Sequence, residues 1–295
     1  MERHQITGHT ELIGLLAYPI RHSQSPATHN AAYEKLGVDI VNLAFEVDTP
    51  ELEDAIKGLR ALKLRGANVS MPNKTIVHQY LDEISPAARL CGAVNTIVNK
   101  DGYLVGHITD GIGYVQSLKD NDIDPTGKKL TIVGSGGAAT AVEIQAALDG
   151  VAEMSIFARD DKFKQNALDT VKKINENTNC KATFYPLEDL DKLKEEMHSS
   201  YLFTNATGVG MKPIEGITYI PDPSFFRPDL IVTDVVYAPH ETAMLKMARH
   251  AGCKTMNGQG MMLFQAIAAI ELILGKRVDS EYMKEKLGIS YVYED

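Results

Sequence analysis

The sequence predicts an α/β protein made of two domains. Apolar runs of strand length alternate with segments of helical periodicity along most of the chain. A length of 295 residues agrees with about two domains. A glycine-rich turn of the kind that binds nucleotides begins at Gly134, so 133 residues precede it. A separate domain is therefore expected in front of the nucleotide-binding unit.

Composition limits the classes of function. The hydrophobic fraction of 44% and the charged fraction of 23% are ordinary for a soluble globular protein with a sizeable core. A net charge of -9, without a run of basic residues, argues against binding to nucleic acid. A small anionic substrate stays possible, because a few local groups are enough to bind it.

Three cysteines lie far apart in the sequence, at Cys91, Cys180 and Cys253. Their spacing suggests neither a disulfide framework nor a zinc site, so reduced and mostly buried thiols are expected. The N-terminus is polar, and no apolar run reaches the ~18 residues of a membrane helix. We therefore expect a cytoplasmic protein.

The first part of the chain is expected to form an α/β domain with a mostly parallel sheet. After three alternating strands and helices, two apolar runs flank an Asp-Gly pair, which is typical of a hairpin. The expected strands are Leu12–Ala17, Val41–Val47, Gly66–Ser70, Ala93–Asn99 and Tyr103–His107, and the expected helices are Pro26–Leu36, Thr49–Leu62 and Lys74–Ile84.

The second part alternates regularly, as expected for a parallel sheet with helices between the strands. An apolar helix, Met261–Leu274, is expected to return to the first domain. The expected domains are residues 1–112, completed by 259–295, and residues 113–258. The expected strands of the second domain are Leu130–Val133, Met154–Ala158, Ala182–Tyr185, Tyr201–Asn205 and Leu230–Asp234.

The segment LTIVGSGGAAT, residues 130–140, predicts a Rossmann-type dinucleotide-binding domain. Gly134 allows a tight turn, Gly136 lets the main chain approach a pyrophosphate, and Ala139 permits close helix packing. The amides that open the following helix then face the phosphates.

The charged residues that follow the second expected strand of the nucleotide-binding domain, Met154–Ala158, bear on whether the cofactor is NAD or NADP. A carboxylate, Asp160 or Asp161, favours the free 2′-hydroxyl of NAD, whereas Arg159 can pair with the 2′-phosphate of NADP. We expect NAD as the preferred cofactor, with NADP also possible. The alternative is a charged turn that binds no ligand.

Two residues are candidates for proton transfer. Lys74 follows a strand, a proline and an asparagine, at the end of a parallel strand where ligands bind. The alternative interpretation is that Lys74 is a solvated lysine that opens a helix. Asp110 stands in a glycine-flanked turn at the domain boundary, and its alternative is a helix N-cap.

Other polar residues are candidates for substrate binding. Ser23 and Ser25 precede a helix, where hydroxyls and helix amides together hold a carboxylate, although capping alone also explains either serine. Gln265 lies in an apolar stripe, so its amide needs a partner from a ligand or from the protein. His240 and Glu241 begin like a metalloprotease helix without its second histidine, so no metal site is expected.

Together, several segments resemble the shikimate dehydrogenase family, and in particular its quinate/shikimate dehydrogenase branch. The resemblance runs almost from end to end. The segments that carry it are YPIRHSQSP, NVSMPNK, AVNT, the Thr109 and Asp110 pair, GSGGAA, TNATGVGM, VVY and NGQGMMLFQA.

The resemblance implies roles for residues in both domains. Lys74 and Asp110 would form the catalytic pair, and Ser23 and Ser25 would bind the substrate carboxylate. Further substrate contacts would come from Ser70, Asn95, Asp110, Tyr237 and Gln265. The cofactor would contact Gly134, Ser135, Gly136, Gly137 and Ala138 at the pyrophosphate, Ala158, Arg159, Asp160 and Asp161 at the adenosine ribose, and Asn205, Thr207, Gly208, Val235, Tyr237 and Gly258 near the nicotinamide.

The implied activity is hydride transfer between a nicotinamide cofactor and a ring alcohol. The substrates would be shikimate and 3-dehydroshikimate, and also quinate and 3-dehydroquinate, in aromatic amino-acid biosynthesis or quinate use. A homodimer is the expected assembly. The family usually has asparagine where Ile108 and Ala158 stand, so the preferred substrate stays open. One alternative is a non-catalytic NAD(P)-binding sensor of the same fold. Another is a folate-type or amino-acid dehydrogenase, and the paired serines and Gln265 distinguish this chain from that class.

Overall fold

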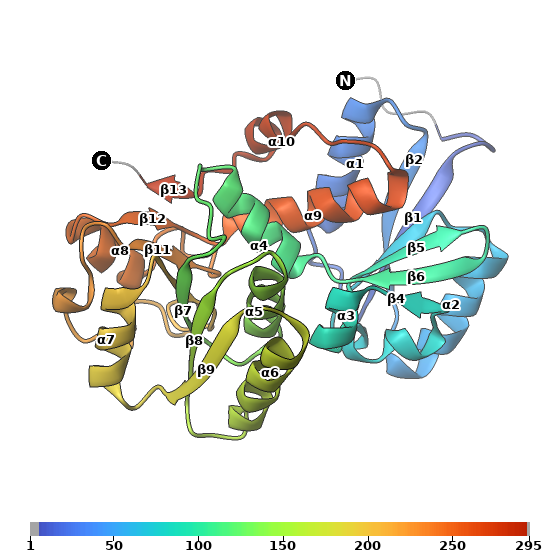
Figure 1. Cartoon of the computed structure of the whole chain (residues 1–295). Coiled ribbons are helices and arrows are strands. Elements are labelled where there is room, and N and C mark those ends of the chain that lie inside the picture. The colour runs from blue at the N-terminus through green and yellow to red at the C-terminus, as the bar shows by residue number, and fades with distance from the viewer. Residues whose placement is uncertain (1–5, 294–295) are drawn as a thin grey trace. The chain divides into compact units, whose positions relative to one another are not determined.

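The computed structural model describes residues 6–293, which form two compact units (Figure 1). Unit 1 contains the described residues up to Thr109 together with Leu263–Ile289, and unit 2 contains Asp110–Met262 and the described residues from Ser290. The C-terminal segment thus differs from the expected division. Its last strand pairs within the sheet of unit 2, so residues 290–293 belong to that unit.

Unit 1 is built on a six-stranded sheet with the order β2-β1-β3-β5-β6-β4. Strands β1, β2 and β3 are parallel, whereas β5 is antiparallel to both of its neighbours. The expected hairpin is therefore present as β5 and β6. The strands are β1 Glu11–Ala17, β2 Ile40–Glu46, β3 Gly66–Val69, β4 Glu83–Ile84, β5 Thr96–Lys100 and β6 Tyr103–His107.

The helices of unit 1 bury apolar faces against this sheet. Helix α1 packs on β2 and on α10, and its Tyr33 is 1% exposed. Helix α9 lies against β3, where Ile273 approaches Gly66. The helices are α1 Ser25–Leu36, α2 Leu52–Ala61 after the 3-10 turn η1 Thr49–Glu51, α3 Pro86–Cys91, α9 Gln259–Leu274, which begins in unit 2, and α10 Ser280–Leu287.

The expected helix Lys74–Ile84 is wrong. Two 3-10 turns, η2 Asn73–Thr75 and η3 Val77–Tyr80, and the short strand β4 take its place. The carbonyl of Lys74 accepts a hydrogen bond from the amide of Val94 at 2.8 Å, so it is not used by a following helical turn. A long-range hydrogen bond therefore overrides the local helical pattern.

Unit 2 is built on a seven-stranded sheet with the order β13-β12-β11-β10-β7-β8-β9, parallel except for β13. The strand order reverses between β7 and β10, as in the doubly wound nucleotide-binding fold. The strands are β7 Lys129–Val133, β8 Glu153–Ala158, β9 Lys181–Pro186, β10 Leu202–Asn205, β11 Ile231–Asp234, β12 Lys254–Met256 and β13 Val292–Tyr293, and the helices are α4 Asp110–Lys119, α5 Gly137–Leu148, α6 Lys164–Asn177, α7 Leu190–Ser199 and α8 Ala243–His250.

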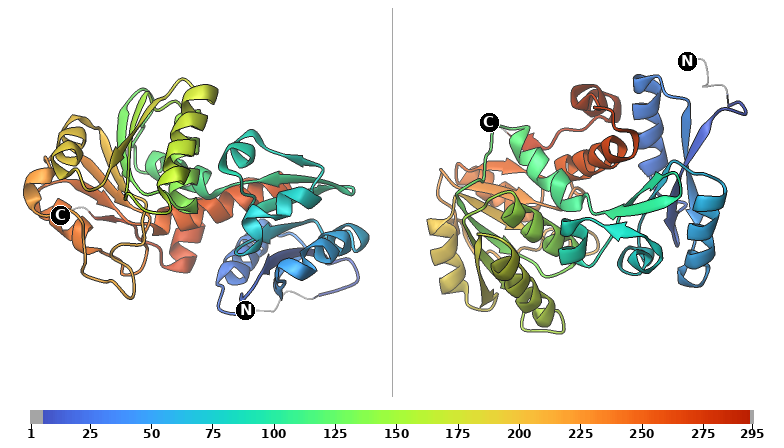
Figure 2. Two further views of the ribbon diagram at one scale, coloured as in Figure 1. Left: turned by 90° about the horizontal axis from the view of Figure 1, so that it is seen from below. Right: turned by 45° about the vertical axis from the view of Figure 1, so that its right-hand side comes forward.

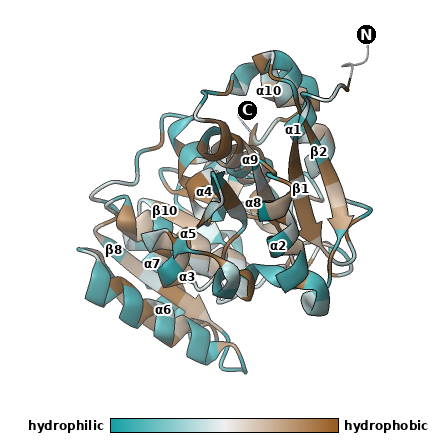
Figure 3. Cartoon of the chain, turned by 90° about the vertical axis from the view of Figure 1, so that its right-hand side faces the viewer, coloured by the Kyte–Doolittle hydropathy of each residue, from teal (hydrophilic) through white to brown (hydrophobic). Residues whose placement is uncertain are grey.

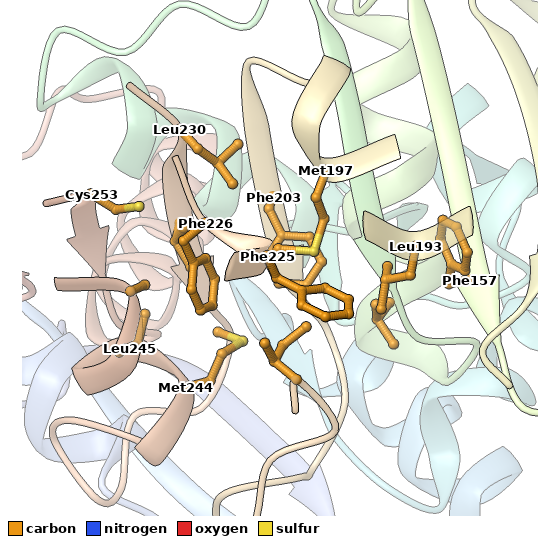
Figure 4. Close-up of a cluster of buried hydrophobic side chains, with 14 residues drawn as sticks. Phe157, Leu193, Met197, Phe203, Phe225, Phe226, Leu230, Met244, Leu245 and Cys253 are labelled. Carbon is orange, nitrogen blue, oxygen red and sulfur yellow. The ribbon is translucent and has the colours of Figure 1, made fainter. Parts of the chain in front are cut away.

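Helices cover both faces of the sheet of unit 2. Helix α5 packs on α4 and on α6, and α7 and α8 lie across the sheet from α5 and α6 (Figures 1 and 2). Figure 4 shows a cluster of buried hydrophobic side chains in unit 2, in which Phe203 of β10 lies near Met197 of α7 and Leu245 of α8 lies near Met244. Figure 3 shows the largely hydrophilic α6 in contrast with the hydrophobic β1 of unit 1.

Two further observations concern cysteines and membranes. Cys180 and Cys253 are buried, Cys91 is partly exposed, and none of these three described residues forms a disulfide. Between residues 6 and 293, no helix has the length and apolar character needed to cross a membrane.

Candidate active site

The polar residues of unit 1 gather at one edge of its sheet. Thr96 of β5 lies opposite Asn68 of β3 and His107 of β6. Because β5 runs antiparallel to both neighbours, its first residues lie beside the carboxyl ends of β3 and β6. Ser70, Asn95 and Thr109 therefore leave the sheet at the same edge.

Asn95 connects the strands at this edge. It is 5% exposed, and its main-chain carbonyl accepts a hydrogen bond from the amide of Val69 at 2.8 Å. Its Nδ2 donates to Oγ1 of Thr109 at 2.9 Å, and its Oδ1 accepts from the amide of Thr109 at 2.9 Å. Thr109 immediately precedes Asp110, the first residue of α4. Asn95 therefore fixes the main chain that leads into Asp110.

The main chain around Lys74 is held by two hydrogen bonds, one made by its own carbonyl and one made by the side chain of Asn73. It lies half-buried in η2, and its carbonyl accepts from the amide of Val94, next to Asn95. Asn73 beside it is fully buried, and its Nδ2 donates to the carbonyl of Val47 at 2.8 Å. The main chain of Lys74 is thus anchored on both sides within unit 1.

Ser23 and Ser25 lie at the beginning of α1. The hydroxyl oxygen of Ser23 accepts from the amide of Ser25 at 3.2 Å. Gln24 is the N-cap residue and makes no side-chain capping bond. Gln265 lies half-buried on the part of α9 that belongs to unit 1. Hydroxyls beside helix amides suit a carboxylate ligand.

Asn68 is a candidate that the sequence interpretation missed. It is 9% exposed, and its Oδ1 accepts no hydrogen bond from any residue in the described part of the chain. It precedes Ser70 by two positions, so both side chains project from the same side of the chain as it leaves β3. A polar side chain within the apolar run GANV was the available signal.

The turn between β7 and α5 has the geometry of an anion-binding loop. Gly134 has a φ of +153°, and a Cβ there would lie 2.6 Å from the carbonyl oxygen of Ala206. At Gly136 and Gly137 a Cβ would meet no atom of residues 6–293 within 4 Å, so this side of the turn is open. Gly136 is the N-cap of α5 and has no side chain to cap its amides. These amides and the open space fit a pyrophosphate.

The carboxylates after β8 have local partners. Oδ1 of Asp161 accepts from the amide of Phe163 at 2.9 Å, and its Oδ2 lies 3.3 Å from Nε of Arg159. Asp160 pairs with Lys164 at 3.0 Å. The side chain of Arg159 is 71% exposed. The surface here thus offers an accessible guanidinium, while both carboxylates already interact with donors or cations.

A buried carboxyl group joins the strand ends on the other side of the turn. Asp234, at the end of β11, is 2% exposed. Its Oδ1 accepts from the amide of Val236 and from Nδ2 of Asn205, both at 2.9 Å, and its Oδ2 accepts from Oγ1 of Thr242 at 2.8 Å. Burial raises the pKa of Asp234 to about 7. Asp234 therefore ties together the ends of β10 and β11 and the start of α8.

Asn205 holds the turn that follows β10. It is 1% exposed, and its Oδ1 accepts from Oγ1 of Thr207 at 2.7 Å and from the hydroxyl of Tyr219 at 3.2 Å. Its side chain is therefore used inside the protein, next to Thr207 and Gly208. Tyr237, which follows β11, is 53% exposed.

Comparison with known proteins assigns the family. The model of the shikimate dehydrogenase substrate binding domain matches residues 15–97. A protein of Listeria innocua named shikimate dehydrogenase (NADP(+)) is 59% identical over 283 residues, which are 96% of this chain and 97% of the relative. The chain belongs to the shikimate dehydrogenase family. The predictions that the chain belongs to this family and that it is an oxidoreductase are thereby confirmed.

Two further members of the shikimate dehydrogenase family agree. A relative from Streptococcus uberis, also named shikimate dehydrogenase (NADP(+)), is 51% identical and covers 96% of this chain and 97% of its own length. A crystal structure of shikimate 5-dehydrogenase from Listeria monocytogenes, in complex with shikimate and NAD, has a TM-score of 0.94 and 58% identity and covers 97% of this chain and 99% of its own. The two-domain α/β fold is thereby confirmed.

The expectation of NAD as the preferred cofactor is wrong. Relatives 59% and 51% identical to this chain both carry NADP(+) in their names. The expectation gave weight to Asp160 and Asp161 as ribose ligands, but the structure engages them with Lys164 and with Arg159 and the Phe163 amide. A carboxylate with local partners is a weaker argument for a free 2′-hydroxyl.

Proposed function

We propose that this chain is a shikimate dehydrogenase that interconverts shikimate and 3-dehydroshikimate with NADP. One observation from the geometry supports the proposal most directly. The adjacent residues Val94 and Asn95 hold the main chain of Lys74 and the residue before Asp110. Two separate segments that carry an ammonium and a carboxylate are thus anchored to the same point of the sheet of unit 1.

The proposed reaction needs a proton acceptor and a hydride acceptor. Oxidation of a secondary alcohol breaks its O–H and C–H bonds, and the products are a ketone, a proton and a reduced cofactor. The cofactor, when bound, supplies or accepts the hydride. The Lys74 and Asp110 pair accepts the single proton of the hydroxyl. In the reverse direction, the Lys74 ammonium polarises the ketone and donates a proton to the developing alkoxide.

Substrate binding is assigned to the polar residues of unit 1. Ser23 and Ser25, at the start of α1, would bind the carboxylate. Ring hydroxyls would contact Ser70, Asn95 and Gln265, and the buried Oδ1 of Asn68 offers a further acceptor. Ile108 is 4% exposed and brings no polar group where the family usually has asparagine. Quinate as a second substrate stays a prediction.

Cofactor binding is assigned to the strand ends of unit 2. The amides of Ser135 to Ala138 would bind the pyrophosphate, and Arg159 would pair with the 2′-phosphate. Thr207, Val235, Tyr237 and Gly258 would lie near the nicotinamide.

An absorbance assay at the NADPH band tests the proposal, with shikimate and quinate each combined with NADP+ and NAD+. The highest kcat/KM is expected for shikimate with NADP+. Absence of turnover with every pair would overturn the proposal and favour a non-catalytic nucleotide-binding protein. Size-exclusion chromatography with light scattering would test the predicted homodimer.

A further inference from the structure

The segment Val235–His240 follows β11, carries the exposed Tyr237, and has no regular secondary structure. We propose that Asn257 is a positioning residue that holds this segment in place for the hydride-transfer step. This inference rests on the proposed function, because it concerns the residues assigned to the nicotinamide side. Its consequence is that the last strand of the chain takes part in building the active site.

Asn257 connects three parts of unit 2. It follows β12 and is 4% exposed. Its Nδ2 donates to the carbonyl of His240 at 2.9 Å and lies 3.1 Å from the hydroxyl of Tyr293. Its Oδ1 accepts from the amide of Gln259, the first residue of α9, at 2.9 Å, and its own amide donates to the carbonyl of Tyr291 at 2.9 Å. A single buried amide thus joins the segment to α9 and to β13.

Gly258 holds the other end of the same segment. Its amide donates to the carbonyl of Val236 at 2.9 Å. A Cβ at this position would lie 2.0 Å from the carbonyl oxygen of Val235, so only glycine lets the main chain at residue 258 come this close to the main chain at residue 235. The segment is therefore held at residues 235–236 by Gly258 and at residue 240 by Asn257.

The last strand completes the arrangement. The hydroxyl of Tyr293 lies 2.6 Å from Nδ1 of His240 and also donates to the carbonyl of His240. Nε2 of His240 donates to the carbonyl of Ser290 at 2.6 Å. His240 is thus bonded to the C-terminal strand through its ring and its main chain.

These contacts are separate from those that form the phosphate site. The glycine turn lies between β7 and α5, and Arg159 follows β8, whereas Asn257 acts on residues that follow β11. Loss of the Asn257 side chain should therefore disturb the position of Tyr237 and leave the phosphate site intact. A small misplacement of groups around reacting atoms lowers kcat strongly.

Three substitutions test the proposal, with one matched control. Asn257→Ala removes all side-chain bonds, Asn257→Asp keeps the acceptor for Gln259 and removes the donor, and Tyr293→Phe removes only the hydroxyl. The control is Asn175→Ala, because Asn175 of α6 makes two 2.9 Å hydrogen bonds to the main chain of Ala182, far from the strand ends in question.

We expect kcat for shikimate oxidation to fall about 10- to 100-fold in both Asn257 variants, through misplacement of groups at the reaction centre. Loss of the Tyr293 hydroxyl should lower kcat only about 3-fold, because Asn257 still donates to the carbonyl of His240. The control should keep the kcat of the wild type. The Kd of adenosine 2′,5′-bisphosphate, measured by titration calorimetry, should stay within about 2-fold in all variants, because this probe lacks the nicotinamide.

Hydrogen exchange followed by mass spectrometry gives a readout without turnover. Peptides that cover residues 235–242 should exchange faster in the Asn257→Ala variant, and those of α5 should not change. Unchanged exchange in 235–242, or a loss of bisphosphate affinity parallel to the loss of kcat, would overturn the positioning role. Absence of shikimate turnover in the wild type would instead count against the proposed function, while the exchange result would still decide whether Asn257 holds the segment.

Discussion

At the scale of single residues, the proposed catalytic groups depend on neighbours that do no chemistry. Lys74 and Asp110 lie on segments held by Val94 and Asn95, and both hydrogen-bonding atoms of the Asn95 amide are used to hold Thr109. The sequence motif NVSMPNK indicated Lys74 but carried no sign of its anchor. Residues that hold a catalytic group are therefore found by following hydrogen bonds in the structure.

Replacement of Lys74 by alanine tests the proton-transfer role. We expect kcat to fall by about 100-fold or more with a modest change in KM, because proton transfer is lost while the other substrate contacts remain. Steady-state kinetics with shikimate and NADP+ measure this. Lys100→Ala, which removes an exposed lysine at the end of β5, serves as the control. An unchanged kcat for Lys74→Ala would exclude the role.

Replacement of Asp234 tests the buried network of unit 2. Asp234→Ala removes the acceptor of three hydrogen bonds, so the free energy of unfolding should fall by about 2 to 4 kcal/mol. In Asp234→Asn one oxygen can still accept from Val236 and Asn205, and a loss of about 1 kcal/mol is expected. Urea denaturation measures both losses. Unfolding is followed by circular dichroism, because the chain has no tryptophan whose fluorescence could report it. Equal losses in the two variants would contradict the hydrogen-bond explanation.

At the scale of elements, the close packing of α4 on α5 depends on a glycine. A Cβ at Gly111 would lie 2.2 Å from the carbonyl oxygen of Ala141 and 2.5 Å from Cβ of Gln145. No rotation of a flexible side chain removes a clash with the main chain. The two helices could come this close only because residue 111 has no side chain.

Gly111→Ala is therefore expected to destabilise the protein by about 1 to 3 kcal/mol through overpacking. Gly58→Ala provides the matched comparison, since Gly58 lies inside α2 and a Cβ there would meet no other atom of the described residues within 4 Å. That change should stabilise by about 0.5 to 1 kcal/mol through helix propensity. Thermal unfolding of both variants checks the pair. Stabilisation by Gly111→Ala would show that α4 can move away from α5 at little cost.

The elements that the sequence predicted were the long periodic ones. The hairpin around Asp101, the helix after the glycine turn and the apolar α9 were all recognisable from local patterns. Helices α3, α8 and α10 and strands β4, β12 and β13 were missed. The missed strands are two or three residues long, too short for a periodic signal, and they exist because neighbouring strands offer hydrogen bonds.

At the scale of the whole molecule, a carboxyl group buried in α5 makes stability depend on pH. Glu143 is fully buried, and neither side-chain oxygen has a hydrogen-bond partner within residues 6–293. Burial raises the pKa of Glu143 from 4.5 to about 8. Between these two values the folded protein keeps a proton that the unfolded chain releases. Stability therefore falls as pH rises through this window.

Glu143→Gln should remove this dependence. Each pH unit in the window lowers the free energy of unfolding of the wild type by about 1.4 kcal/mol. The free energy of unfolding of the variant minus that of the wild type should therefore increase by about 4 kcal/mol from pH 5 to pH 8. Asp234, whose pKa burial also raises, adds a slope of the same sign to both proteins and cancels in the comparison. Urea denaturation at several pH values measures the difference. Parallel pH curves for the two proteins would show that Glu143 is not responsible.

The sequence by itself determined the two α/β units, the nucleotide turn and the family, because strand and helix periodicity, glycine positions and linear motifs are local properties of a chain. The tertiary structure decided what those residues do together. It engaged the carboxylates after β8 with local partners, replaced the helix expected at Lys74, and placed Tyr293, which lies 36 positions beyond Asn257 in the chain, within 3.1 Å of it. Such contacts depend on the register of strands and on long-range hydrogen bonds, which no local pattern encodes.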